Sequence, residues 1–176
     1  PNIAVNSAEV QATAFCRELV GETFLTAMFS KLTPNAFLLL AKIIATSDTL
    51  TSLNISHNNK TLNGQLAVQF AEALAPSEVT TLDMGSNKLN GQDAVKFAAA
   101  LASSKVTTLD IGHNDINGKY TVQFAEALAP SKVTTLDMSY NKINGQYAVK
   151  FAKALAPSKV TTLDMSDNTA GKTHAD

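Results

Sequence analysis

The sequence has few of the residues that mark disulfide-rich, nucleic-acid-binding or membrane-spanning proteins. Among its 176 residues there is no tryptophan, one cysteine and three tyrosines, and the charges nearly cancel at a net −1. The single Cys16 excludes an internal disulfide and a cysteine-rich metal site, which is typical of a chain that works in a reducing compartment. The small net charge gives no general attraction to nucleic acid or to anionic lipid. The apolar run that starts at Phe37 is broken at Lys42, far short of the roughly 18 residues of a transmembrane helix.

What the sequence does have is a repeat of 27 residues. Three near-identical copies, 80–106, 107–133 and 134–160, follow one another without a gap. An earlier copy begins at Leu50, and a later one opens at Val160 and stops after Asn168. The repeated positions include Leu82, Leu109, Leu136 and Leu163, then Gly64, Gly91, Gly118 and Gly145, and Phe70, Phe97, Phe124 and Phe151.

Each copy has two halves with different periods. After Thr81 apolar and polar residues alternate, which predicts a short strand with one buried face. Further along, apolar residues lie at i, i+3, i+4 and i+7, which predicts an amphipathic helix: Ala94, Phe97, Ala98 and Leu101. So short a copy cannot bury its own core, and the copies must stack. Parallel strands pair at about 4.8 Å and helices need about 8–10 Å, so the stack bends. We therefore expect an α/β, right-handed curved solenoid with strands on the concave face and helices on the convex face.

The strand half carries a recognisable pattern, seen as Val79-x-x-Leu82-x-Met84-x-x-Asn87-x-Leu89. It resembles the leucine-rich repeat over residues 50–168. The helical half is similar to the ribonuclease-inhibitor-like subclass, which occurs in innate-immune receptors and in bacterial effectors. The resemblance implies that one asparagine per copy hydrogen-bonds loop backbone of neighbouring copies. These asparagines are Asn58, Asn87, Asn114, Asn141 and Asn168.

The same pattern divides the chain. We expect a helical N-terminal cap at 1–49, repeats of 27–29 residues at 50–168 and a tail at 169–176. The cap can include a degenerate repeat helix over 34–47. Apolar residues at helical spacing predict two further helices in it, through Ala12, Phe15, Cys16 and Leu19 and through Leu25, Met28, Phe29 and Leu32. No helix follows the last strand, at 163–165, so we expect that the natural protein continues or that another chain covers this edge.

No group of residues has the spacing of a catalytic or metal site. Gly171-Lys172-Thr173 resembles the end of a phosphate-binding loop, but Ser166 stands where that motif needs its first glycine. His57 and His113 lie two copies apart, about 10 Å, which is too far to share a metal ion. We therefore expect no enzyme activity, no metal and no cofactor.

The first candidate binding residues form an acidic row. One aspartate follows the strand leucine in each of four copies, namely Asp83, Asp110, Asp137 and Asp164. Stacking puts them side by side on the concave face, where they would receive a basic segment of a partner protein. The alternative is a solvated acidic ladder copied by duplication. Calcium is a weaker occupant because it prefers converging oxygens to a flat row.

The second candidates are the positions at which near-identical copies differ. Ser86, His113, Tyr140 and Asp167 occupy one column where each strand ends. Asp93, Tyr120 and Tyr147 occupy another at the start of each helix. Exposed tyrosines beside an acidic groove are anchor residues for an interface. Drift at unconstrained surface positions explains the same variation.

Together these features predict a protein-binding module without chemistry of its own, with no nucleic-acid or membrane partner. The likeness to repeats of bacterial effectors suggests secretion into a host cell and a host protein as target. Two alternatives stay open. One is the recognition part of a larger enzyme, such as a ligase or a GTPase regulator. The other is a homotypic assembly module that pairs through its uncapped last strand.

Overall fold

A computed structural model describes residues 24–26, 33–58, 62 and 64–168. Within these residues short strands alternate with helices. The strands are β1 (Phe24–Thr26), β2 (Ser52–Asn54), β3 (Thr81–Asp83), β4 (Thr108–Asp110), β5 (Thr135–Asp137) and β6 (Thr162–Asp164). The helices are α2 (Pro34–Ile44), α3 (Gly64–Leu74), α4 (Gly91–Ala100) with the 3-10 turn η1 (Leu101–Ser103), α5 (Gly118–Leu128) and α6 (Gly145–Leu155). In this described part of the chain, no helix combines the length and apolarity needed to cross a membrane.

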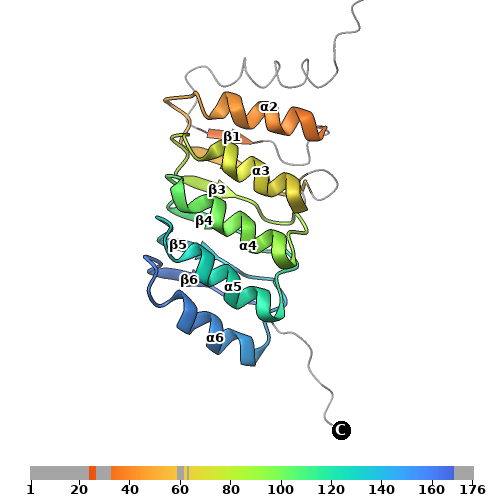
Figure 1. Cartoon of the computed structure of the whole chain (residues 1–176), viewed down its shortest axis with the longest axis vertical. Helices are drawn as coiled ribbons and strands as arrows, with labels where there is room; N and C mark the ends of the chain where they lie inside the picture. The colour runs from red at the N-terminus through yellow and green to blue at the C-terminus, as the bar shows by residue number, and fades with distance from the viewer. Residues whose placement is uncertain (1–23, 27–32, 59–61, 63, 169–176) are drawn as a thin grey trace, which may run out of the picture.

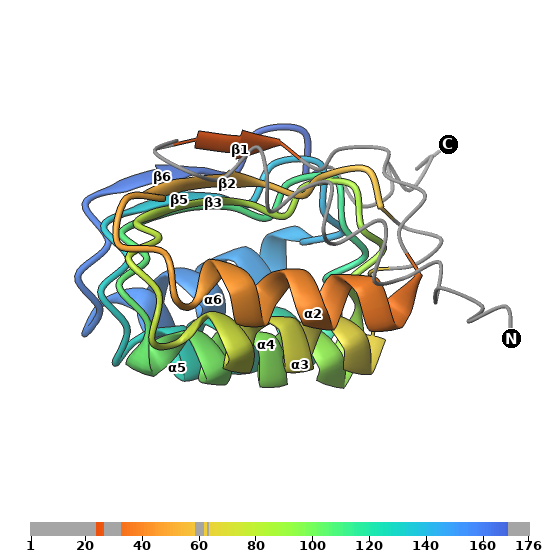
Figure 2. The ribbon, with the colours of Figure 1, turned by 90° about the horizontal axis from the view of Figure 1, so that it is seen from above.

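The strands form one parallel sheet in chain order, from β1 to β6. The register is the same at every step between repeats, so that Leu82 lies opposite Leu109 and Leu109 opposite Leu136. Seen along the stack, the strands form one layer and the helices the other (Figure 2). The helices lie side by side down the length of the molecule (Figure 1). This architecture confirms the predicted α/β solenoid.

The core lies between the two layers. Each strand buries its central leucine and leaves its outer two residues half exposed in β2 to β5. Each helix contributes one fully buried phenylalanine, and this column comprises Phe37, Phe70, Phe97, Phe124 and Phe151. The rings of Phe37 and Phe70 meet edge to face with centroids 6.1 Å apart. Burial at every 27th residue is what makes adjacent copies interdependent.

The buried asparagines have the role that the resemblance implied. The Asn114 side chain donates to the backbone oxygens of Met84 at 3.1 Å and Ile111 at 3.0 Å. Its oxygen accepts from the backbone amides of Asn87 at 3.1 Å and Leu89 at 2.8 Å. One side chain therefore joins two repeats and satisfies buried loop groups that water cannot reach.

The N-terminal region corrects one prediction. Residues 24–26 form β1, which pairs in parallel with β2 and places Leu25 opposite Leu53. The helical stripe predicted through Leu25 is therefore wrong at that residue, because a strand here satisfies the backbone groups of the β2 edge. The predicted repeat-like helix is present as α2, beside α3 (Figure 1). The other residues of the two predicted helices lie outside the described part of the chain.

Candidate functional site

The parallel register gathers the four aspartates into a row. Each is the last residue of its strand, and Asp110 lies opposite both Asp83 and Asp137, with Asp164 next to Asp137. The strands point their central leucines at the helices, so the aspartates face away from the core on the outer face of the sheet. The first three are half exposed, and Asp164 is fully exposed.

The carboxylates also have a structural role, which the sequence reasoning missed. The Asp110 Oδ1 accepts the backbone N–H of Gly112 at 2.8 Å, and the other three accept from the residue two positions on at 2.7–2.9 Å. In the earlier repeat Asn54 stands at the same position, and its Oδ1 accepts from Ser56 N at 3.0 Å. The bond ends each strand in a local turn. Because Asn54 makes it with a neutral amide, the turn does not require the charge.

The charges have unequal environments along the row. Burial raises the pKa of Asp110 above its usual value, the hydrogen bond from Gly112 lowers it, and the charges of Asp83 and Asp137 raise it further. His113 lowers the same pKa, which places the imidazole within electrostatic reach of the row. At the exposed end, the hydrogen bond from Ser166 lowers the pKa of Asp164.

The variable column at the strand ends has an unusual backbone. His57, Ser86, His113, Tyr140 and Asp167 all have φ between 50° and 58°. This left-handed conformation is uncommon for a residue with a side chain, and more so for a tyrosine. The column is held by the next repeat, since the amides of His113 and Tyr140 donate to Ser139 O at 3.0 Å and Ser166 O at 3.1 Å. No glycine marks these positions, so sequence reasoning had no signal for the conformation.

Three of the predicted binding residues come into contact in this column. The rings of His113 and Tyr140 stack with centroids 4.0 Å apart and planes at 9°. A hydrogen bond to Asp167 raises the pKa of Tyr140. The Tyr140 side chain is 49% exposed, so a ligand can reach its ring. Aromatic and acidic groups thus lie together in a column that runs alongside the aspartate row, three residues further along each repeat.

The other two tyrosines have a different environment from the one predicted. A Cβ added at Gly91 would lie 3.6 Å from the Tyr120 ring, and one added at Gly118 would lie 3.9 Å from the Tyr147 ring. Both glycines have positive φ, so each tyrosine packs over a tight turn of the preceding repeat. The rings are half-buried at the starts of α5 and α6, in the helical layer. Both rings are therefore only partly exposed, and a binding role for Tyr120 and Tyr147 stays a prediction.

The aspartate row does not have the geometry of a metal site. In the described part of the chain, no three side chains among histidine, cysteine, aspartate and glutamate are grouped closely enough to hold a metal ion. Parallel strands in register place equivalent residues side by side, so the four carboxylates form a row. They do not converge on one point, as the oxygen ligands of a metal ion must. What the row can do is attract and pair with cationic groups.

Comparison with known proteins agrees with this architecture. Residues 46–59, 102–119 and 129–151 match the family described as Leucine Rich repeat. The actin-binding site 2 of leiomodin-1 superposes with a TM-score of 0.67 at 14% identity, covering 87% of this chain and 90% of that one. An internalin from Listeria monocytogenes gives 0.42 at 17% identity, covering 81% of this chain and 47% of that one. No curated protein matches the chain. The fold is a leucine-rich-repeat solenoid.

Proposed function

We propose that this chain is a protein-binding module that receives a basic segment of its partner on the outer face of the sheet. The observation that carries the proposal is the contrast between Asn54 and the four aspartates. All five side chains make the same turn, but only the aspartates are charged. The charge therefore has no local structural use, and in the middle of the row it is opposed by burial and by its neighbours. A cationic partner would relieve that repulsion.

The stacked pair extends this surface beyond the acidic row. Tyr140 offers an exposed ring face, and its backbone is held by the next repeat, so little side-chain freedom is lost on binding. Tyrosine and arginine dominate many interfaces because both combine apolar area with polar contacts. We place the centre of the site at Asp110, Asp137, His113 and Tyr140. No catalytic role is proposed for any of these residues.

Fold-level precedent supports binding and leaves the partner open. Leucine-rich repeats generally mediate protein–protein interactions, and the leiomodin-1 structure is itself an actin-binding site. We also keep as a proposal that the chain is of the ribonuclease-inhibitor-like subclass and is a secreted bacterial effector acting on a host protein. Support for that step is the resemblance of the repeats alone. A reporter fused to the chain, followed into host cells during infection, tests it.

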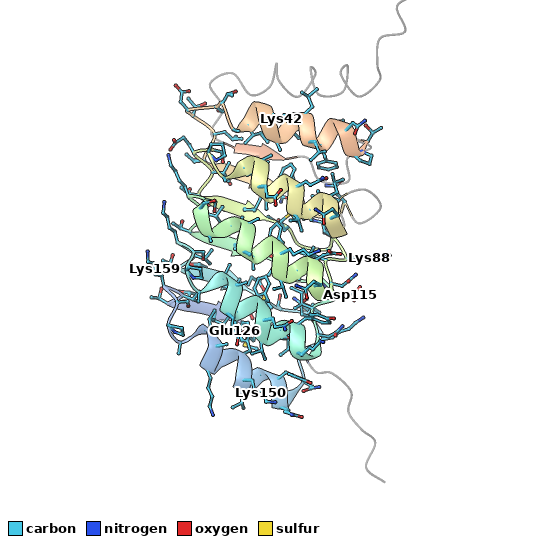
Figure 3. The ribbon with its side chains drawn as sticks, viewed as in Figure 1. Lys42, Lys88, Asp115, Glu126, Lys150 and Lys159 are labelled. Atoms are coloured by element: carbon cyan, nitrogen blue, oxygen red, sulfur yellow. The ribbon has the colours of Figure 1, made fainter. Side chains whose placement is uncertain are left out.

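The main experiment compares two sets of charge changes in capture from host-cell lysate. One variant replaces Asp83, Asp110 and Asp137 with asparagine, which Asn54 shows to be compatible with the turn. The control removes the same number of negative charges from exposed positions elsewhere, with Asp48→Asn, Glu72→Gln and Glu126→Gln. Glu126 lies on the outer helical layer (Figure 3).

The proposal predicts a protein that is captured by the wild type and by the control but lost from the row variant. The same protein should be released by salt, because exposed charge pairs are screened. Equal capture by all three would refute the acidic face as the site. Circular dichroism of each variant checks that the fold is unchanged.

Homotypic assembly is a second candidate because of one observation. Val149 is 59% exposed on α6 and Leu163 is 38% exposed on β6, whereas the matching Leu136 is 1% exposed. Large apolar side chains therefore reach the surface together at one end of the described array. Such an edge is a template for pairing with another chain.

A further inference from the structure

The variable column at the strand ends is regular from one repeat to the next. His57, Ser86, His113 and Tyr140 share the left-handed conformation, with φ between 50° and 58°. Each donates its backbone N–H to a carbonyl of the following repeat, at 3.0–3.1 Å. Because the backbone conformation and the register repeat, the side chains leave the column in the same direction, and each lies beside its counterpart in the next copy.

Where two neighbours in this column carry rings, the rings stack. The centroids of His113 and Tyr140 are 4.0 Å apart and their planes differ by 9°, so Tyr140 covers one face of the imidazole. The opposite face of His113 is turned toward the preceding repeat, where the column holds Ser86 with a single hydroxymethyl group. No ring from the described residues stacks on that face. The column therefore presents an open imidazole face beside a small residue.

The position over Ser86 is large enough for one planar group. The residue before it in the column is His57, so two strand steps of about 4.8 Å separate the two histidine positions by roughly 10 Å. A stacked planar group needs about 3.5–4 Å on each side. Ser86 is half exposed and His113 is exposed, so a group from a partner can reach this position from solvent.

Two carboxylates border the same position. Gly85 directly precedes Ser86, and a Cβ added to Gly85 would lie 3.2 Å from Asp83 Oδ1 and 3.5 Å from Asp110 Oδ1. Each of these oxygens accepts one backbone N–H, whereas a carboxylate offers about four acceptor sites, so both aspartates can accept further bonds. The charge of His113 lowers the pKa of Asp110, which places the ring and the carboxylate within electrostatic reach of each other.

We propose that an arginine side chain of the partner binds over Ser86, with its guanidinium stacked on His113 and its N–H groups paired with the neighbouring aspartates of the row. The inference rests on the proposed function and names the residue type that the acidic face selects. A guanidinium is planar, cationic and a donor of five N–H groups, so it meets both the ring face and the carboxylates. A lysine ammonium pairs with the carboxylates but has no planar face to stack. An uncharged aromatic group stacks but leaves the carboxylates unpaired.

Titration calorimetry of the full 176-residue chain with two capped peptides, tetra-arginine and tetra-lysine, tests the proposal. The two peptides carry equal charge and differ in the shape of the cationic group. Measurement at about pH 8 and 50 mM salt keeps an ordinary imidazole neutral and leaves exposed charges little screened. Tetra-arginine should bind the wild type about fivefold more tightly than tetra-lysine, because only the guanidinium gains the stacking contact with His113.

A pair of variants assigns the preference to the imidazole face. His113→Ser combined with Tyr140→Ser removes both rings and should bring the affinity for tetra-arginine down to that for tetra-lysine. The matched control, Tyr140→Ser alone, keeps the face of His113 beside Ser86 and should keep the preference. Serine suits this backbone position, since Ser86 has φ 56°, and circular dichroism verifies the fold of each variant.

The outcomes separate this inference from the proposal on which it rests. Equal affinity of the wild type for both peptides, with both lost from the row variant, would overturn the arginine site and leave acidic-face binding intact. A preference for tetra-arginine that persists without the two rings would also overturn it, because His113 would not be its cause. Failure of both peptides to bind the wild type would overturn the arginine site and the acidic face together.

Discussion

Two consecutive stretches of this molecule have nearly the same sequence and very different surroundings. The repeat that contains β5 has neighbours on both sides, and Leu136 is 1% exposed; at β6 the matching Leu163 is 38% exposed. The backbone is the same in both, since Tyr140 and Asp167 have φ of 50° and 53°. Local sequence thus determines the conformation of a copy, and the adjacent copy determines its burial. In a solenoid, the energetic value of a residue depends on its place in the array.

The largest expected difference is in the strand leucines. Leu136→Ala removes a fully enclosed side chain and should lower the free energy of unfolding by about 3 kcal/mol. Leu163→Ala removes a half-exposed one and should cost less than about 1 kcal/mol in a dilute monomer. Urea denaturation of both variants measures the gap. Equal losses would mean that the two environments are alike and would contradict the comparison.

The asparagines should show the same difference between an interior repeat and the last one, with a smaller difference in the loss of stability. Asn114→Ala leaves several buried loop groups without partners and should cost about 2–3 kcal/mol. Asn168 is only half-buried, so Asn168→Ala should cost about 1 kcal/mol. Thermal denaturation at one protein concentration compares them. A larger loss at Asn168 would show that the terminal loop is better packed than its exposure indicates.

Substitution of one interior residue should make the fold more stable. Thr121 Oγ1 is buried without a hydrogen-bond partner in the described part of the chain, and the matching residues of α3, α4 and α6 are alanines. Thr121→Ala should therefore stabilise the fold by about 1 kcal/mol, from relief of the unpaired hydroxyl and from helix propensity. The reverse change in the neighbouring helix, Ala94→Thr, should destabilise it. If Thr121→Ala destabilises, the methyl group of Thr121 contributes more than its hydroxyl costs.

The smallest effect concerns the aspartates and pH. The pKa of Asp110 is raised in the folded state, so the folded chain binds more protons than the unfolded chain between 3.8 and that raised value. The Asp110 contribution to stability accordingly falls as pH rises through this window. Asp110→Asn should thus stabilise the fold slightly at pH 7, and the gain should vanish near pH 3. Denaturation at both pH values measures it, and a gain that persists at pH 3 would exclude the electrostatic cause.

Much of this fold was predictable because the repeat constrains it several times over. The alternation at Leu82 and the spacing from Ala94 to Leu101 recur in each copy, so a single misread element would conflict with its neighbours. The aspartate row could be predicted from the same repeat, because stacked copies place equivalent residues side by side. The N-terminal strand did not, because three residues around Leu25 carry no period, and pairing with β2 decides their conformation.

The site was less predictable than the fold. Grouping of His113, Tyr140 and Asp167 was visible in the spacing, but their stacking and hydrogen bonding depend on side-chain orientation. The partial burial of Tyr120 and Tyr147 in the helical layer could not be predicted for the same reason. A residue at the start of a helix can point to solvent or across the preceding repeat, and here the glycine turn below each ring decides. Turn residues of one copy therefore determine where side chains of the next copy lie.

The most direct test of the central claim is the affinity of the captured partner for the wild type and for the variant with Asp83, Asp110 and Asp137 changed to asparagine. Titration calorimetry at two salt concentrations gives both dissociation constants. The account predicts a constant roughly tenfold larger for the variant, with a weaker dependence on salt. Identical constants and identical salt dependence, with both proteins folded, would contradict the claim that the acidic strand face is the binding surface.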